Sequence, residues 1–247
     1  MRRFFVEEID TDKRTLTLGG TEANHIRTVL RMAPGDRLIL TDSKGARYEA
    51  VIVSLDRREV RVNLERPLLP PPPSPVEITL CQAVLRSHPM DMIIQKTSEL
   101  GVDRVLPFVS ERTLVKPDRQ AAAGKLRHWR EIALSATKQS GRLKPAEIGP
   151  LLTFSELMEV WRKEEIMKVV LWEEESVRSL KNLLRSSGPA PKAVAVIGPE
   201  GGFSNEEIEK AGEAGFVPAS LGQRILRAET AAITLVSLFQ YEWGDLG

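Results

Sequence analysis

Glycines are concentrated in one stretch whose form suits ligand binding, VAVIGPEGGFSNEEIEKAGEAGF at residues 194–216. A short apolar run ends there in a Gly-Pro-Glu-Gly-Gly turn, and a polar segment follows. Gly198, Gly201 and Gly202 carry no Cβ, so the chain can adopt positive φ and bring backbone N–H and C=O groups close to a ligand. Tight packing alone would also explain such a turn. The turn matches neither G-x-G-x-x-G nor G-x-x-x-x-G-K-[ST], so we do not expect a nucleoside triphosphate.

A second stretch, SLGQRILRAETAA at residues 220–232, combines arginines with the start of an apolar helix. Glu229 and Thr230 are ordinary helix-start residues, because negative and hydroxyl groups suit the positive end of the helix dipole. Arg224 and Arg227 do not fit that explanation, since positive charge at this end opposes the dipole. They favour an anionic or electron-rich partner.

Composition excludes several classes of protein. The 247 residues are 42% hydrophobic and 28% charged, as in soluble globular proteins. Apolar runs such as AVAVIG fall far short of the roughly 20 residues that span a bilayer. The N-terminal MRRFFVEEIDTDK reaches acidic residues too soon for a secretory signal, so we expect a cytoplasmic protein without a membrane span. A single cysteine, Cys81, and three scattered histidines predict neither disulfides nor a metal site.

Basic residues gather between Arg112 and Lys144, where nine lysines and arginines face two acidic residues. A solvated helix face would explain this run. A surface for RNA phosphates is the alternative, in which case binding should weaken as salt rises.

The run ERPLLPPPPSPVE predicts a domain boundary, because consecutive prolines cannot donate to a sheet and favour an extended spacer. We place an N-terminal domain at residues 1–69, a linker at 70–75 and a C-terminal domain at 76–247. Before the linker, RLILTD, RYEAVIVSL and EVRVNLER read as short strands of a small β-barrel. One helical interruption, EANHIRTVLRM, should bury Ile26, Val29 and Leu30 and leave His25, Arg27 and Arg31 facing outward.

After the linker, strands alternate with longer helices, which predicts a mainly parallel sheet covered on both faces. The expected strands include VEITLCQAV, RVLPFVS, MKVVLWEE and AVAVIG. The expected helices include MDMIIQKTSELG, residues 121–140, 177–184 and 228–243, and a segment after Ser204. Ser204 and Glu207 have the spacing of a capping box, and Gly215 is a typical helix end.

Several motifs together resemble one family. IGPEGGFSNEEIEKA and LGQRILRAETAA, preceded by MDMIIQKTSELGV, VSERTLV and ATKQSGR, resemble the RsmE family of N3-uridine methyltransferases of small-subunit ribosomal RNA, within the SPOUT superfamily. The resemblance covers the whole chain, from NHIRTVLRMAPGD to YEWGDL. The chain departs from the family pattern at LRSHPMD, where a Lys-Gly-Asp-Arg-Met type run is usual, and at Lys138, where an acidic residue is usual.

The resemblance implies a PUA-like RNA-binding domain followed by a SPOUT α/β domain with a trefoil knot. It further implies a homodimer that binds S-adenosylmethionine in a bent conformation and acts on 16S ribosomal RNA of the small ribosomal subunit. The implied cofactor-binding residues lie in three loops and are Leu171, Ile197, Gly198, Pro199, Glu200, Gly201, Gly202, Ser220, Leu221, Gly222, Ile225 and Leu226.

The implied reaction moves a methyl group to uracil N3, which must first lose its proton. Arginines aimed at the uracil oxygens would stabilise the anion. Glu229, Glu200 or water could accept the proton. The candidate catalytic residues are Arg227, Arg224, Glu229 and Arg142. The candidate RNA-binding residues are His25, Arg27, Arg31, Arg86, Lys138, Gln139 and Ser140. The alternatives are transfer to a ribose 2′-hydroxyl and a non-catalytic RNA-binding protein of ribosome assembly.

Overall fold

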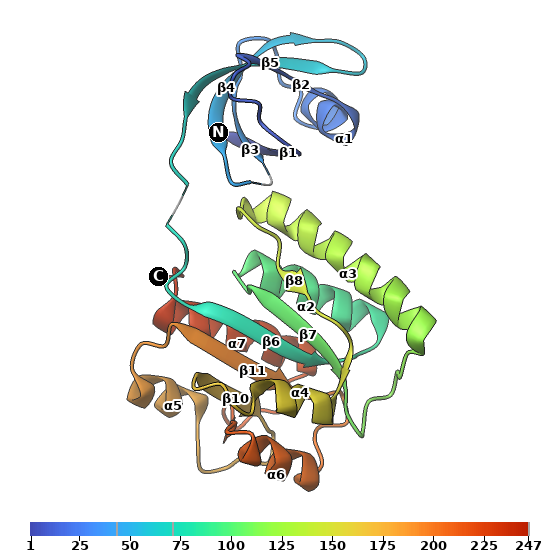
Figure 1. Ribbon diagram of the computed structural model, residues 1–247, viewed down its shortest axis with the longest axis vertical. Coiled ribbons are helices and arrows are strands. Elements are labelled where there is room, and N and C mark those ends of the chain that lie inside the picture. The colour runs from blue at the N-terminus through green and yellow to red at the C-terminus, as the bar shows by residue number, and fades with distance from the viewer. Residues whose placement is uncertain (43, 71, 247) are drawn as a thin grey trace. The chain divides into compact units, whose positions relative to one another are not determined.

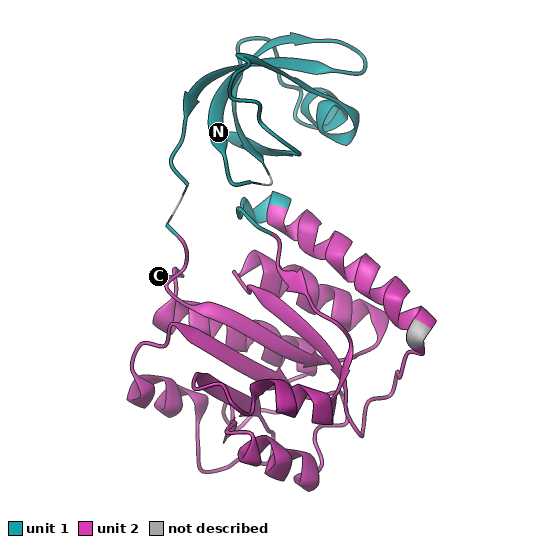
Figure 2. Ribbon diagram, viewed as in Figure 1, with its two compact units in different colours: residues 1–72, 138–144 teal, residues 73–137, 145–247 magenta. Residues whose placement is uncertain are grey.

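The computed structural model describes residues 1–42, 44–70 and 72–246, and it divides into two compact units (Figure 2). The first unit comprises Met1–Pro72 together with Lys138–Lys144, and the second comprises Pro73–Thr137 and Pro145–Gly247. Contacts group Lys138–Lys144 with the N-terminal unit, although the sequence places this segment far inside the C-terminal domain, and the domain limits drawn from the sequence stay a prediction. Pro71 of the expected linker lies outside the described residues.

The first unit is built on a five-stranded sheet in the order β1-β3-β4-β5-β2, which curls in Figure 1. Its strands are β1 (Arg2–Val6), β2 (Thr15–Leu18), β3 (Arg37–Asp42), β4 (Arg47–Leu55) and β5 (Val60–Pro67). Strands β1 and β3 are parallel, and the other pairs are antiparallel. The expected β domain is therefore present. Among the described residues, no pairing joins β1 to β2, so the sheet stays open where a closed barrel was expected.

The helical segment of this unit is irregular. Helix α1 (Gly20–Asn24) continues directly into a π-helical turn, η1 (His25–Val29), and Arg31 then takes a left-handed φ of 52°. Ile26 is buried as predicted, but Val29 is 67% exposed. The prediction for Val29 was wrong because it assumed 3.6 residues per turn, and a π-turn rotates later side chains away from that face.

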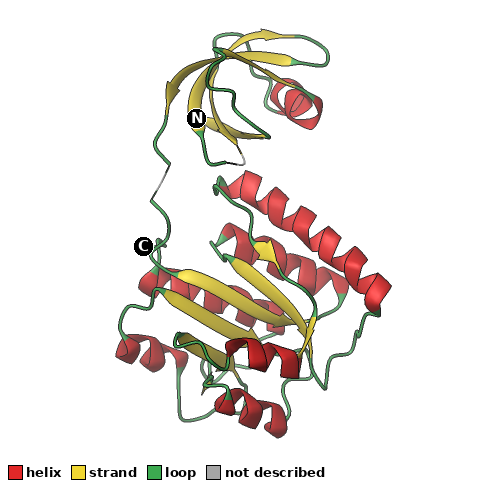
Figure 3. Ribbon diagram, in the orientation of Figure 1, coloured by secondary structure: helices red, strands yellow, loops and turns green. Residues whose placement is uncertain are grey.

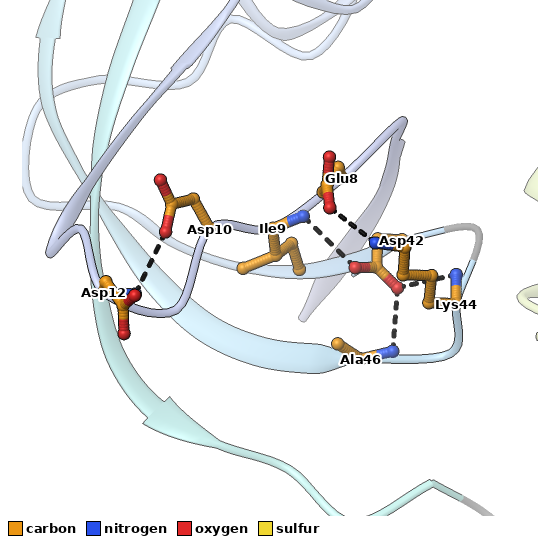
Figure 4. A network of polar contacts seen from close by, with 7 residues as sticks. All are labelled: Glu8, Ile9, Asp10, Asp12, Asp42, Lys44 and Ala46. Carbon is orange, nitrogen blue, oxygen red and sulfur yellow. Dashed lines mark hydrogen bonds and ion pairs between the residues drawn. The ribbon is translucent and has the colours of Figure 1, made fainter.

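A buried carboxylate, that of Asp42 at the end of β3, binds several backbone N–H groups (Figure 4). Asp42 accepts hydrogen bonds from the backbone N–H groups of Ile9 at 3.1 Å, Lys44 at 2.9 Å and Ala46 at 2.8 Å. It is only 1% exposed. One side chain thus joins the segment after β1 to the β3–β4 hairpin and satisfies amide donors that have no place in the strand ladder.

The second unit contains a parallel sheet in the order β12-β10-β11-β6-β7-β8, with β9 also paired to β7. Its strands are β6 (Glu77–Ala83), β7 (Arg104–Val109), β8 (Glu147–Ile148), β9 (Leu152–Thr153), β10 (Met167–Leu171), β11 (Lys192–Ile197) and β12 (Val217–Ala219).

Helices cover both faces of this sheet (Figures 1 and 3). One face packs against α2 (Ser87–Glu99), α3 (Arg119–Ser140), α5 (Leu180–Ser187) and α7 (Ala228–Trp243). The other packs against α4 (Phe154–Trp161) and α6 (Asn205–Glu213). In β11, Ala193, Ala195 and Ile197 enter the first core, whereas Val194 and Val196 enter the second. Both faces of this strand are apolar because both are covered. The expected α/β architecture is confirmed.

Candidate functional site

The strand order of the second unit creates a natural crevice. Strands β6 and β11 are neighbours in the sheet. After β6 the chain continues to β7 on one side of this pair, whereas after β11 it continues to β12 on the other side. Ligands of open parallel sheets bind at such a switch point, beyond the carboxyl ends of the strands. The loops that follow β6, β10, β11 and β12 all meet there.

A cavity of about 620 Å³ lies at this edge. Its size falls within the range of small-molecule sites. The cavity has apolar walls and a few charged groups. It is lined by Arg86, Pro89, Leu114, Leu171, Trp172, Glu173, Ile197, Gly198, Pro199, Glu200, Gly202, residues 219–229 and Ala231. All of these residues belong to the second unit.

Most of the candidate cofactor-binding residues line this one cavity. They come from the end of β10, from the glycine loop after β11 and from the loop after β12, and they are Leu171, Ile197, Gly198, Pro199, Glu200, Gly202, Ser220, Leu221, Gly222, Ile225 and Leu226. Gly201 instead faces Arg112. The structure brings these residues together, and their role toward a cofactor stays a prediction.

The three glycines of the Ile-Gly-Pro-Glu-Gly-Gly turn serve different purposes. Gly202 has a φ of 68°, and a Cβ there would overlap the Glu173 carboxylate. Gly198 does not take a positive φ, but a Cβ would lie 3.0 Å from the Phe203 ring. At Gly201 a Cβ would lie 3.2 Å from the Cβ of Arg112. The expectation of positive φ therefore holds for Gly202 alone, and close packing explains the other two glycines.

The helix after the glycine loop begins as the sequence indicated. Ser204 is the N-cap of α6, and its side chain and that of Glu207 form the reciprocal capping box. Gly215, just after the helix, has a φ of 86°. These two local signals fix both ends of α6 and hold the glycine loop at a defined place before it.

The loop after β12 is held by the loop after β10. Ser220 receives a hydrogen bond at its carbonyl from the Leu180 N–H at 2.9 Å, and its own N–H donates to the Arg178 carbonyl at 3.0 Å. Gly222 then turns with a φ of 114°. The loop ends at Arg227, which is the N-cap residue of α7.

Three of the candidate catalytic residues line the cavity. Arg224 and Arg227 come from the loop after β12, and Glu229 comes from the first turn of α7. Arg142 belongs to the first unit, within Lys138–Lys144. The cavity also holds Glu200, whose carboxylate accepts a long bond of 3.4 Å from the Arg86 N–H.

The candidate RNA-binding residues fall in both units. Arg86 lines the cavity. His25, Arg27 and Arg31 lie on η1 and just beyond it. His25 is exposed, and its ring centre lies 6.2 Å from that of Phe4 in an edge-to-face arrangement.

The remaining three candidates, Lys138, Gln139 and Ser140, form the last residues of α3 and belong to the first unit. Lys138 pairs with Glu22 at 3.3 Å, within that unit. The RNA-binding role of these residues stays a prediction.

Several lining residues escaped sequence reasoning. Trp172 and Glu173 directly follow Leu171, so the end of β10 was a usable signal for them. Leu114 has no such signal, because it enters the cavity from the distant segment between β7 and α3. The other unforeseen lining residues are Pro89, Ala219, Ala228 and Ala231.

The described residues contain neither a membrane-spanning helix nor a cluster of metal ligands. In that part of the chain, no helix is both long and apolar enough to cross a membrane. Within the same residues, no group of three or more histidine, cysteine, aspartate or glutamate side chains is placed to hold a metal ion.

Both units match models of known protein families. Residues 72–240 match an RNA methyltransferase domain, and residues 18–65 match an RNA methyltransferase PUA domain.

Individual relatives cover the chain from end to end. The Bacillus subtilis protein named ribosomal RNA small subunit methyltransferase E is 31% identical over 98% of this chain and 97% of its own length. A ribosomal RNA small subunit methyltransferase E from Neisseria gonorrhoeae, solved with S-adenosylmethionine, has a TM-score of 0.83 and 32% identity, with both chains covered completely at 100%. A Legionella pneumophila protein solved with the same cofactor has a TM-score of 0.83, 33% identity and coverage of 99% and 98%.

Proposed function

The chain belongs to the ribosomal RNA small subunit methyltransferase E family, and on this premise we propose that it methylates N3 of a uridine in 16S ribosomal RNA with S-adenosylmethionine as the methyl donor. The observation that carries the proposal is the cavity at the switch point of the parallel sheet, formed by the glycine loop and the arginine-bearing loop after β12.

The residues of the cavity fit this cofactor. Leu171, Ile197 and Leu226 supply apolar walls suited to an adenine ring. Glu173, Glu200 and Glu229 supply carboxylates, which suit a ligand that carries a sulfonium and an ammonium group. The backbone of the glycine loop lies at the cavity without intervening side chains at Gly198 and Gly202. When bound, S-adenosylmethionine supplies an electrophilic methyl group.

The chain's own residues must favour the uracil anion. Arg224 and Arg227 are the proposed donors to the uracil oxygens, where negative charge develops as the N3 proton leaves. Arg227 also stands at the N-terminus of α7, whose dipole adds to the positive potential. Glu229, in the first turn of the same helix, is the proposed proton acceptor, since it lines the same cavity. The proposed catalytic role of Arg142 draws no support from the cavity, because this residue belongs to the other unit.

RNA is the proposed macromolecular substrate of both units. The match of residues 18–65 to an RNA methyltransferase PUA domain supports an RNA-binding role for His25, Arg27 and Arg31 in the first unit. Lys138, Gln139 and Ser140 are proposed RNA contacts of the same unit, and Arg86 is the proposed contact at the cavity. N3 lies on the pairing edge of uracil, so the target must be unpaired or flipped out of a helix.

Three features of architecture belong to this proposal. The C-terminal segment is proposed to form the SPOUT trefoil knot, which the bonds of Ser220 to Arg178 and Leu180 and the packing of α7 against α2 support. Two subunits are proposed to meet beside the cavity, where Leu114 is 62% and Ile225 86% exposed. The proposed domain limits are those drawn from the sequence, residues 1–69 and 76–247. The protein is proposed to act on ribosomes in the cytoplasm.

Methyl transfer with labelled S-adenosylmethionine tests the function. The purified protein is incubated with 16S ribosomal RNA and with small subunits that lack the modification, and the RNA is digested to nucleosides. We expect label in N3-methyluridine, and no label in subunits that already carry the modification. Label in a 2′-O-methyl nucleoside, or none on either substrate, would contradict the proposal.

A further inference from the structure

The turn that follows β7 belongs to the motif VSERTLV and is held by hydrogen bonds between its own residues. Ser110 and Thr113 are 3% and 4% exposed, and the Ser110 N–H donates to the Thr113 hydroxyl at 2.9 Å. The Thr113 N–H returns a bond to the Ser110 carbonyl at 3.3 Å. The two small side chains thus lock the turn, and Glu111 and Arg112 are presented at its outer side, where both are exposed.

A buried carboxylate docks this turn on the start of α6. Glu207 is 6% exposed, and its Oε1 accepts a bond from the Glu111 N–H at 2.9 Å. Its Oε2 accepts from the Ser204 N–H at 3.2 Å, as part of the capping box. Glu207 therefore joins the turn after β7 to the residue that ends the glycine loop.

Arg112, in the same turn, contacts the glycine loop directly. Its Nη1 donates to the Gly201 carbonyl at 3.2 Å, and the close approach of its Cβ explains why position 201 has no side chain. On the other side of the loop, the buried Gln82 amide lies 3.5 Å from the Gly198 carbonyl. Two carbonyls of a loop rich in conformational freedom are thereby contacted by Gln82 of β6 and by Arg112 of the turn after β7.

We infer that the segment Ser110–Leu114 belongs to the cofactor site, with Arg112 as a positioning residue that fixes the backbone of Gly198–Gly202. Leu114, two residues further on, lines the cavity and supplies an apolar wall. This inference rests on the proposed function. It assigns Arg112 to the support of the cofactor loop, whereas the basic run between Arg112 and Lys144 indicated a solvated helix face or a surface for RNA phosphates. A loop fixed before binding loses less conformational entropy when the ligand arrives, so the expected effect is on cofactor affinity.

Calorimetric titration of the full-length protein with S-adenosylmethionine, without RNA, tests the inference. Arg112→Ala should bind the cofactor about tenfold more weakly, because the glycine loop is no longer held by this bond and must be ordered when the ligand binds. Arg112→Lys keeps a charged donor and should recover part of the affinity. The control Arg127→Ala removes an exposed arginine of α3 and should bind as the unaltered protein does. In steady-state assays Arg112→Ala should raise KM for the cofactor and leave KM for RNA unchanged.

Other results would overturn the inference. If Arg112→Ala binds S-adenosylmethionine normally but binds RNA with a salt dependence reduced by about one phosphate contact, the residue is an RNA contact. If Arg112→Ala does not fold, Leu114→Ser tests the same segment, and unchanged cofactor affinity would contradict the proposal. An unaltered protein that binds no cofactor would overturn the proposed function as well, whereas equal affinities of unaltered and variant proteins would overturn this inference alone.

Discussion

Arg227 occupies a position where its charge opposes local stability. It is the N-cap residue of α7, and its side chain makes no capping hydrogen bond to that helix, all of whose residues are described. A positive charge at a helix N-terminus is unfavourable, by about 0.3–1 kcal/mol at exposed sites. The residue lines the cavity, so its proposed contact with the substrate, and not the helix, would account for its placement.

Arg227→Ala should therefore separate activity from stability. We expect methyl transfer under saturating cofactor and RNA to fall roughly 10²–10³-fold, as when one donor to a developing oxyanion is removed. The melting temperature should stay the same or rise slightly. Single-turnover transfer and thermal denaturation measure the two effects, with Arg185→Ala, at an exposed arginine of α5 outside the basic run, as the control. A variant with normal transfer would show that Arg227 does not contact the reacting base.

At the scale of single residues, local motifs predicted what lies within one loop. The Gly-Pro-Glu-Gly-Gly turn and the pair Arg224 and Arg227 stand out because their types conflict with ordinary strand or helix use. Arg112 could not be assigned to the glycine loop, nor Leu114 to the cavity, since they lie about 85–115 residues away along the chain from the loops they contact. The pairing of β7 with β6, and of β6 with β11, brings the turn after β7 near the glycine loop.

At the scale of elements, one buried lysine joins the ends of two helices. Lys168 of β10 is 6% exposed, and its Nζ donates to the Trp161 carbonyl at 2.6 Å and the Ala214 carbonyl at 2.9 Å. These carbonyls belong to the last residue of α4 and the C-cap of α6. Terminal helix carbonyls have no partner within their helix, and a cation suits that end of the dipole.

Lys168→Met should cost roughly 2–4 kcal/mol of unfolding free energy, because two buried carbonyls lose their donor. Urea denaturation measures the change. Lys192→Met on the adjacent strand β11 is the control, since its ion pair with Glu77 is exposed and should contribute under about 1 kcal/mol. Equal losses in the two variants would contradict the structural role of Lys168.

The pKa of Lys168 gives this variant a pH signature. Burial lowers the pKa of its ammonium group below the ordinary 10.5, despite the nearby charges of Glu164 and Glu165. The unfolded chain therefore holds this proton more tightly than the folded chain. The contribution of Lys168 to the unfolding free energy should rise as pH increases from neutral toward 10.5, so the difference from Lys168→Met should be larger at pH 9.5 than at pH 7.

Asp42 has a comparable role in the first unit. Its carboxylate accepts three backbone N–H bonds, so Asp42→Ala should destabilise this unit by roughly 2–3 kcal/mol. Asp12→Ala nearby, at an exposed position, is the control. Hydrogen exchange of peptides from β1 and β3 measures the effect within this unit. Unchanged exchange in the Asp42 variant would show that the segment after β1 is held by other contacts.

Long elements were predictable and very short ones were not. Helix α7 was predicted at residues 228–243 and is observed at Ala228–Trp243. Strands β8 and β9 have two residues each and β12 has three, too few for any periodicity to show. Helix α4 was also missed, although its capping box at Thr153 and Glu156 was a readable signal. The π-turn η1 carries no pattern that distinguishes it from an ordinary helix.

At the scale of the whole molecule, the linear sequence predicted two parts but not their full membership. The proline run marks one change of composition, and everything after it alternates as α/β proteins do. The grouping of Lys138–Lys144 with the first unit depends on contacts such as Lys138 with Glu22, which are 116 residues apart. No periodicity or composition reports such a pairing, so domain limits drawn from sequence assumed one continuous segment per domain.

Because the whole lining of the cavity belongs to the second unit, cofactor binding should stabilise the two units unequally. A ligand that binds only the folded state at a concentration of 100 Kd adds about 2.7 kcal/mol to the stability of what it binds. With saturating S-adenosylmethionine, hydrogen exchange should slow in residues 197–204 and 219–231. It should stay unchanged in β1 and β3–β5 of the first unit.

S-adenosylhomocysteine, which lacks the methyl group and the sulfonium charge, is the matched probe. It should protect the same peptides less if the carboxylates of Glu173, Glu200 and Glu229 face that charge. Protection confined to the first unit would place the cofactor elsewhere, and equal protection by both compounds would remove the proposed role of the carboxylates while keeping the site.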